Sequence, residues 1–255
     1  MKITQVRNAT LIIEYAGTKF LVDPMLAKKG IYPGFEGTPN SHLKNPTVEL
    51  TVPMDQICDV DAIIVTHTHP DHWDDAAKSL LPKHLPVLVQ HEKDREIIRI
   101  SGFFDVRLIT DGQFNGVTLS QTSGQHGTDS ALSAMGEILG EVCGVVFKSP
   151  SEKTLYLAGD TVWNQFVQDS LDQFQPDVII LNSGDAQVIG LGSIIMNKQD
   201  VREVYKAAPQ ATLVASHMES VNHSMLTRKE LREFSAENGM TDRLLVPEDG
   251  EAYSL

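Results

Sequence analysis

Three histidines and one aspartate lie within six residues, in the segment His67-Thr68-His69-Pro70-Asp71-His72. Imidazole nitrogens and carboxylate oxygens are the ligands that Zn²⁺ and similar transition ions take in proteins. Taken singly these residues have ordinary alternatives, because a histidine after a strand is usually a polar loop residue and Asp71 could cap a helix beginning near Trp73. Burying all four groups together without a cation would be costly, so the cluster as a whole predicts a metal site.

A buried strand must position this cluster. The almost continuous apolar run Asp61-Ala62-Ile63-Ile64-Val65-Thr66 is typical of a strand covered on both faces, and the histidines follow its end directly.

This motif resembles that of the metallo-β-lactamase superfamily of binuclear metallohydrolases, whose most specific signature is His-x-His-x-Asp-His. Three later positions fall where that family places its remaining ligands: His126 in Ser123-Gly124-Gln125-His126-Gly127, Asp160 in Ala158-Gly159-Asp160-Thr161, and His217 in Ala215-Ser216-His217-Met218-Glu219. Alone, His126 would be a surface loop residue and Asp160 could cap a helix near Trp163, so their joint occurrence with the main motif is what makes them candidate ligands. The resemblance covers essentially the whole chain in the right order. It implies that His67, His69 and His126 hold one metal, that Asp71, His72 and His217 hold the other, and that Asp160 bridges the two. It also implies two divalent ions, with zinc favoured and manganese or iron as the other options. A hydroxide between them would be the nucleophile, and Asp71 would be the catalytic residue that orients it or passes on its proton.

The region after His217 carries a narrower resemblance. Ser216-His217 to Asn222-His223, followed by Leu226-Thr227-Arg228, is similar to the branch that contains the ascorbate-6-phosphate lactonases. Several true β-lactamases have a cysteine where this chain has Asp160, so antibiotic hydrolysis is not expected.

Substrate contacts are expected from Asn222, His223 and Asp23. An exposed turn explains Asn222 and His223 about as well. Asp23 follows a predicted strand, where it could instead support a metal ligand from behind. His42, His84 and His91 have no motif around them and are given no role.

The remaining pattern predicts a single α/β domain over residues 1–255, a four-layer αββα sandwich of two mixed β-sheets flanked by helices, as in the metallo-β-lactamase fold. Helices are expected at 92–100, 163–174 and around 201–208, and a last one is opened by the capping box Thr227-Arg228-Lys229-Glu230, with Leu226 and Leu231 as its hydrophobic staple. The expected strands are 3–7, 10–15, 20–22, 61–66, 87–89, 106–109, 142–148, 154–158, 178–181, 212–215, 243–246 and 252–254.

Two segments are expected to shape the substrate site. Residues 24 to 53 contain five prolines and three glycines, which is typical of a long loop that is either a floppy excursion or a lid. The second is the glycine-rich stretch from Asn182 to Asn197.

Composition narrows the function classes. The charge is −13, from 21 basic and 34 acidic residues, and no basic cluster stands out, so a nucleic-acid partner is not expected. No run of about 18 apolar residues is present, which argues against a membrane span, and the N-terminal segment lacks the apolar core of a signal peptide. The isolated Cys58 and Cys143 indicate a reducing compartment, hence a cytoplasmic location. Whether the chain forms a homo-oligomer is left open.

The main hypothesis is therefore a metal-dependent hydrolase of a small molecule, with a lactone or other ester preferred. A phosphodiesterase or nuclease of the same fold is the second enzyme hypothesis, because two-metal sites also serve phosphoryl transfer. A di-iron redox protein is a different class, but the chain has no Cys-x-x-Cys pair and no spare length for a redox module. A non-catalytic binding protein is the last alternative, and the complete ligand set argues against it.

Overall fold

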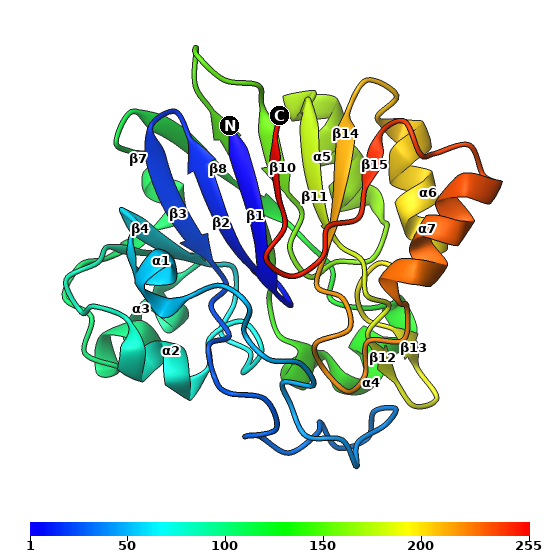
Figure 1. The fold of residues 1–255 in the computed structure, drawn as a ribbon, viewed down its shortest axis with the longest axis horizontal. Helices are drawn as coiled ribbons and strands as arrows, with labels where there is room; N and C mark the ends of the chain where they lie inside the picture. Colours follow the sequence, from blue (N-terminus) through cyan, green and yellow to red (C-terminus); the bar gives the residue numbers. More distant parts are fainter.

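Two seven-stranded β-sheets form the centre of the structure, a computed structural model that describes residues 1–255 (Figure 1). The first sheet has the order β16 (Ala252–Ser254), β1 (Lys2–Arg7), β2 (Thr10–Tyr15), β3 (Thr18–Val22), β4 (Ala62–Val65), β5 (Val87–Val89), β6 (Val106–Leu108). The second has the order β15 (Leu244–Leu245), β14 (Thr212–Ser216), β11 (Val178–Asn182), β10 (Leu155–Leu157), β9 (Cys143–Lys148), β8 (Val117–Ser123), β7 (Gln113–Phe114). A separate hairpin pairs β12 (Gln187–Val188) with β13 (Gly192–Ser193).

Helices cover the outer face of each sheet. The first sheet carries α1 (Met54–Cys58), α2 (Asp75–Leu80) and α3 (Glu92–Ile100), and the second carries α5 (Gln165–Phe174), α6 (Lys198–Ala207) and α7 (Arg228–Glu237). A short 3₁₀ helix, η1, spans Ile109–Asp111. None of the helices combines the length and apolar character that crossing a membrane requires. The expected four-layer αββα sandwich with two mixed sheets is thus confirmed.

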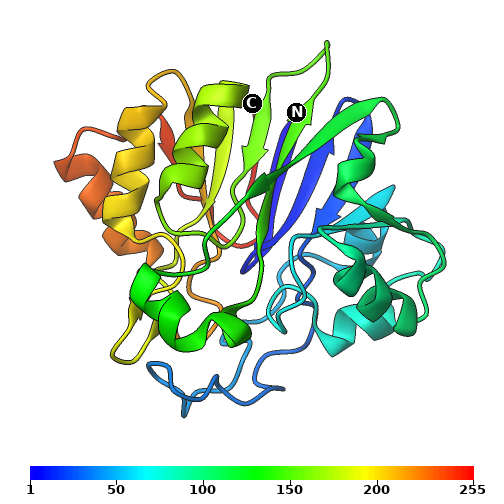
Figure 2. The same ribbon diagram turned by 180° about the vertical axis from the view of Figure 1, so that it is seen from behind.

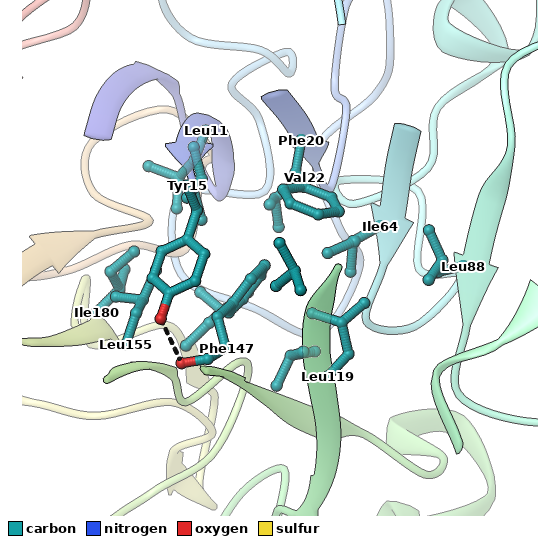
Figure 3. Packing of buried hydrophobic residues seen from close by; sticks show 14 of the residues in the cluster. Leu11, Tyr15, Phe20, Val22, Ile64, Leu88, Leu119, Phe147, Leu155 and Ile180 are labelled. Carbon is teal, nitrogen blue, oxygen red and sulfur yellow. Dashed lines mark hydrogen bonds between the residues drawn. The ribbon is translucent and has the colours of Figure 1, made fainter. Parts of the chain in front are cut away.

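The inner faces of the sheets bury a common apolar core (Figure 3). Phe20 from β3 packs edge-on against Phe147 from β9, with ring centroids 5.4 Å apart at 74°. The hydroxyl of Tyr15 donates to the carbonyl oxygen of Phe147, at 3.0 Å, so the polar end of this buried ring is satisfied. Because both faces of the central strands are covered, β4 and the first four residues of β11, Val178 to Leu181, are unbroken apolar runs rather than alternations.

Strand direction decides where the loops gather. β3 to β6 run parallel in the first sheet, and β10, β11, β14 and β15 run parallel in the second. Parallel strands release their following loops at one edge of a sheet. Figures 1 and 2 show α4 (Asp129–Leu139), the β12–β13 hairpin and the loop after β3 gathered at this edge, at the bottom of both views.

Several helix starts differ from the expectation. α2 begins at Asp75 and is capped by Asp74, so Asp71 is not its cap. α5 begins at Gln165 rather than at Trp163, because the Asn164 side chain accepts from the amides of Phe166 and Val167 and thereby caps it, which excludes Asp160 from that role.

At α7 the capping box of Thr227 and Glu230 is confirmed. Leu226 and Leu231, the expected staple, are both buried in the same apolar cluster.

The segment between β3 and α1 has no strand longer than the isolated bridge between Tyr32 and Asn45, as its prolines and glycines predict. It is nevertheless anchored. The buried guanidinium of Arg7 donates to the carbonyl oxygens of Met25, Ala27 and Val48. These contacts argue against a floppy excursion.

Candidate metal centre

All seven candidate ligands lie at the edge where the loops gather. His67, His69, Asp71 and His72 follow β4, and the other three follow strands of the second sheet. His126 follows β8, Asp160 follows β10 and His217 follows β14 directly. Since β4, β8, β10 and β14 end on the same side of the sandwich, the side chains converge on one place between the sheets.

The first implied ligand set is assembled by the fold. His67, His69 and His126 place their ligand atoms within 4.8 Å of one another. The Nε2 of His67 and the Nδ1 of His69 are 3.0 Å apart. Two imidazole nitrogens this close, with further histidines beside them, form the donor set of a cation site.

The second implied set is assembled in the same way. Asp71, His72 and His217 also place their ligand atoms within 4.8 Å of one another. The Nε2 atoms of His72 and His217 are 3.2 Å apart, and Oδ2 of Asp71 is 3.2 Å from Nε2 of His217. Oδ2 of Asp160 lies 3.1 Å from Nε2 of His72 and 3.7 Å from Nε2 of His126, so this carboxylate stands between the two sets.

Hydrogen bonds behind the rings fix which nitrogen faces inward. Nδ1 of His126 is 2.8 Å from the carbonyl oxygen of Ile194, and Nε2 of His69 is 3.0 Å from that of Ile138. Nδ1 of His72 is 2.9 Å from Oδ2 of Asp23. Such partners hold a ligating histidine in one tautomer and orientation. The donor chemistry and its support therefore fit a metal centre.

The electrostatics of the cluster also suit a cation. Burial lowers the pKa of His126 to about 4, and burial together with neighbouring histidines lowers the pKa of His67 well below its ordinary value. Burial would raise the pKa of Asp160 and Asp71, but the neighbouring histidines, His72 and His217 foremost, together outweigh it and hold both well below their usual range. Neutral imidazoles and ionised carboxylates are the forms that bind metal. Burial opposes a charge on His72, but the carboxylates around it raise its pKa well above the ordinary value, so an ion binding there would displace its proton.

Backbone geometry at the strand ends is unusual. His217 has φ of +57°, a left-handed conformation that non-glycine residues rarely adopt. A Cβ on Gly184 would overlap the carbonyl oxygen of His217, and a Cβ on Gly159 would overlap that of Cys143. Close backbone approach at the site therefore needs glycine at both positions.

The three expected substrate contacts have different outcomes. Asp23 is 1% exposed and lies behind His72, so it supports a ligand and does not face a substrate. Asn222 is buried, and its side-chain amide holds residues 28–45 of the segment between β3 and α1, called the loop 28–45 below. Its Oδ1 accepts from the amide of Phe35 and from Nδ2 of Asn45, while its Nδ2 donates to Oγ1 of Thr38 and to the carbonyl oxygen of Pro39. It has no hydrogen-bonding capacity left for a ligand. The exposed-turn interpretation is wrong for Asn222 and His223, because both are buried.

A cavity of about 260 Å³ opens over the ligands. Its apolar wall is built from three segments: the loop 28–45, α4, and the region around the β12–β13 hairpin. The wall residues are Phe35, Met135, Ile138, Leu139, Ala186, Val188 and Ile194. Two of these segments are the ones expected to shape the substrate site.

Two positioning residues were not expected from the sequence. Asn182, the last residue of β11, donates from Nδ2 to Oδ1 of Asp160 at 2.7 Å and leaves Oδ2 free to face the ligand sets. Asn8, at the β1–β2 turn, donates to the carbonyl oxygen of Asp71 at 3.0 Å. Asn182 could have been found, because it ends a strand parallel to the one before Asp160. Nothing in the local sequence distinguishes Asn8.

The chain is similar to proteins of one kind along its whole length. A family model described as Beta-lactamase superfamily domain matches residues 18–218. The UPF0173 protein YddR of Bacillus subtilis (strain 168) is 50% identical over 257 residues, which cover 100% of both chains. More distant relatives, 24–29% identical, are named UPF0173 metal-dependent hydrolases. None of these names extends to the ascorbate-6-phosphate lactonase branch.

Two solved structures superpose on the whole chain. The isothiocyanate hydrolase from Delia radicum gut bacteria has a TM-score of 0.97 and 49% identity, covering 100% of this chain and 99% of that one. A possible metal-dependent hydrolase from Veillonella parvula DSM 2008 has a TM-score of 0.98 and 44% identity, with the same coverage.

Proposed function

Because this chain belongs to the metallo-β-lactamase superfamily and is a metal-dependent hydrolase, we propose that its substrates are isothiocyanates with neutral, apolar tails. The balanced reaction is R–N=C=S + H₂O → R–NH₂ + COS, in which the water oxygen bonds to the central carbon, the carbon–nitrogen bond breaks and both water protons end on nitrogen. The observation that carries the proposal is the apolar cavity directly over the ligands. The 49% identity to an isothiocyanate hydrolase supports it.

The charge of the cavity selects among substrate classes. None of its fifteen lining residues is a lysine or arginine, and Glu36 adds a carboxylate. A phosphodiester or a phosphorylated lactone would therefore meet no cationic side chain. Lactones and other esters with neutral tails fit the same walls, and they are the second candidate class. Nucleic acids fit neither this cavity nor a chain with a net charge of −13.

We assign the metal roles as the resemblance implies. His67, His69 and His126 would hold one ion, Asp71, His72 and His217 the other, and Asp160 both, with zinc as the proposed metal. Bound divalent ions supply a water-derived nucleophile at neutral pH and Lewis-acid polarisation of the substrate.

The chain's own residues would do the rest. Asp71 borders the cavity with its carboxylate ionised, so it can accept a proton from the attacking water and return it toward nitrogen. The seven apolar wall residues would hold the substrate's tail and keep bulk water away from the reacting carbon.

The test measures COS and amine release from phenethyl and allyl isothiocyanate by the zinc-loaded protein. Asp71→Asn should lower kcat at least 100-fold, whereas Asp59→Asn, the same change at an exposed carboxylate outside the cavity, should leave it unchanged. γ-Butyrolactone, p-nitrophenyl acetate and bis(p-nitrophenyl) phosphate are run beside them. Turnover of the lactone or ester alone would favour the second candidate, and turnover of the phosphodiester alone would contradict both.

A further inference from the structure

His223 is a polar residue of the cavity wall that belongs to neither ligand set. It lines the cavity together with Asp71 and Asp160, and it is only 6% exposed. Its Nδ1 is buried and has no hydrogen-bond partner. A proton on this atom would be enclosed without an acceptor, at a cost of about 1–3 kcal/mol, so the enclosure of Nδ1 decides which tautomer the ring adopts.

Packing fixes the direction of this ring. The ring of Phe35 meets it edge-to-face, with centroids 5.0 Å apart at 85°. The carbonyl oxygen of His223 accepts from the amide of Gln187 at the start of β12, and the preceding Asn222 is tied to the loop 28–45. The imidazole is therefore held in place before any ligand arrives.

Burial lowers the pKa of His223 to about 4, so the ring is neutral at physiological pH and carries one N–H. A proton on Nδ1 would be enclosed without an acceptor. The proton is better placed on Nε2, where a molecule in the cavity can accept it.

We propose that His223 donates a hydrogen bond from its ring N–H to the isothiocyanate nitrogen, the atom that gains negative charge as water adds to the central carbon. The proton stays on the imidazole, and the hydrogen bond strengthens as the charge grows. This assignment rests on the proposed function, and it makes His223 a catalytic residue beside the metal ligands. Removing a preorganised donor of this kind costs about 10²–10³-fold in kcat.

The first experiment compares His223→Leu, His223→Gln and His42→Leu in the zinc-loaded protein with phenethyl isothiocyanate. His223→Leu should lower kcat about 100-fold or more and raise KM no more than about tenfold, and His223→Gln, which keeps an N–H donor, should recover at least a tenfold part of the loss in kcat. His42→Leu makes the same change at an exposed histidine and should match wild type. Zinc content and Tm are measured for every variant. Equal losses in Leu and Gln, or a loss that follows zinc content, would assign His223 a structural role and overturn the proposal.

A second experiment separates this inference from the proposed function. 2-Phenylethyl azide has the same tail and a linear N=N=N group whose first nitrogen, like the isothiocyanate nitrogen, has a lone pair that accepts a hydrogen bond. It is not hydrolysed, so its Kd can be measured by calorimetry in the same variants. His223→Leu should weaken azide binding up to about tenfold, the value of one hydrogen bond. If the wild type does not hydrolyse isothiocyanates but azide binding depends on His223, the proposed reaction fails and the donor role stands. Hydrolysis with no dependence on His223 in either assay would keep the reaction and reject the donor role, and an absence of azide binding to the wild type together with an absence of hydrolysis rejects both.

Discussion

Asp23 offers a direct test of how the protein controls its metal affinity. Oδ2 of this carboxylate is 2.9 Å from Nδ1 of His72 and accepts from the hydroxyl of Thr66 at 2.7 Å, while Oδ1 accepts from the Thr66 amide. Asp23→Asn keeps the size of the side chain and removes its charge. Asparagine also tolerates the left-handed φ of +43° at this position, so the substitution adds no backbone strain.

The size of the effect follows from these contacts. The side-chain amide introduced by Asp23→Asn has one oxygen that accepts and one NH₂ group that only donates. If its oxygen faces His72, the bond loses its charge assistance. If its NH₂ group faces the N–H of His72, two donors oppose each other and the bond is lost. A hydrogen bond to a charged group contributes about 1.5–3 kcal/mol. This corresponds to about 10- to 150-fold in affinity for the ion held by His72. Asp23 reaches the other set, His67, His69 and His126, only through the Thr66 hydroxyl, which lies 3.2 Å from Nδ1 of His67, so the ion that this set would hold should keep most of its affinity.

Competition against a chromophoric chelator at pH 7.5, with zinc counted per chain, resolves the two affinities. We expect one equivalent to weaken in Asp23→Asn and the other to stay, with both unchanged in the control Asp59→Asn. The reasoning is refuted if Asp23→Asn binds two equivalents as tightly as wild type. It is refuted as well if both equivalents weaken equally while the metal-free Tm is unchanged.

Three further outcomes are expected. Gly159→Ala should lower the free energy of unfolding by about 1–3 kcal/mol in urea titrations, because Gly159 has a φ of +71° and the new Cβ would overlap the Cys143 carbonyl oxygen. An unfolding midpoint equal to that of the wild type would contradict this. In metal-free protein, His126 has a pKa of about 4 in the folded state and 6.5 in the unfolded state, so between pH 6.5 and 4 the unfolded state binds one more proton. As the pH falls through this range, His126 should lower the free energy of unfolding by up to about 1.4 kcal/mol per pH unit. Urea titrations at pH 7 and pH 5 measure this loss, which His126→Gln should reduce. Asn182→Ala frees Oδ1 of Asp160 from its hydrogen bond and should reduce zinc affinity about 10- to 100-fold in the chelator assay, an idea that an unchanged affinity would rule out.

The convergence of the candidate ligands could largely be anticipated, because all of them except His126 follow a strand that its composition reveals; β8, the strand before His126, was not expected from its largely polar sequence VTLSQTS. The apolar run before His67 predicts a buried strand without any knowledge of its neighbours. Parallel pairing then brings the ends of such strands to one edge, so residues as distant as His72 and His217 meet. The local sequence pattern thus predicts where the site lies, but it does not predict which substrate binds there.

Two of the three segments of the cavity wall were expected from their prolines and glycines, but α4 and the individual wall residues were not, because these residues have no common periodicity. α4 has the sequence DSALSAMGEIL, in which Gly136 weakens the helical pattern, and Met135 has non-helical angles. This helix packs against residues in and beside the β12–β13 hairpin, Ala186, Val188 and Ile194. Tertiary packing, rather than local propensity, therefore defines the helix that faces the cavity, and Asn222 likewise acquires its role only through contacts with the distant loop 28–45.

Each implied ligand set takes residues from both sheets, which gives the ions a mechanical role. One set joins the loop after β4 to the loop after β8, and the other joins the loop after β4 to His217, which is 145 positions after His72 in the chain. An ion bound to such a set closes a loop far longer than most disulfides do, in a protein whose two cysteines are both free. Metal occupancy would then also stabilise the contact between the two sheets. Removing the metal with a chelator should make the amides of β4 and β14 exchange faster before exchange in the outer helices changes.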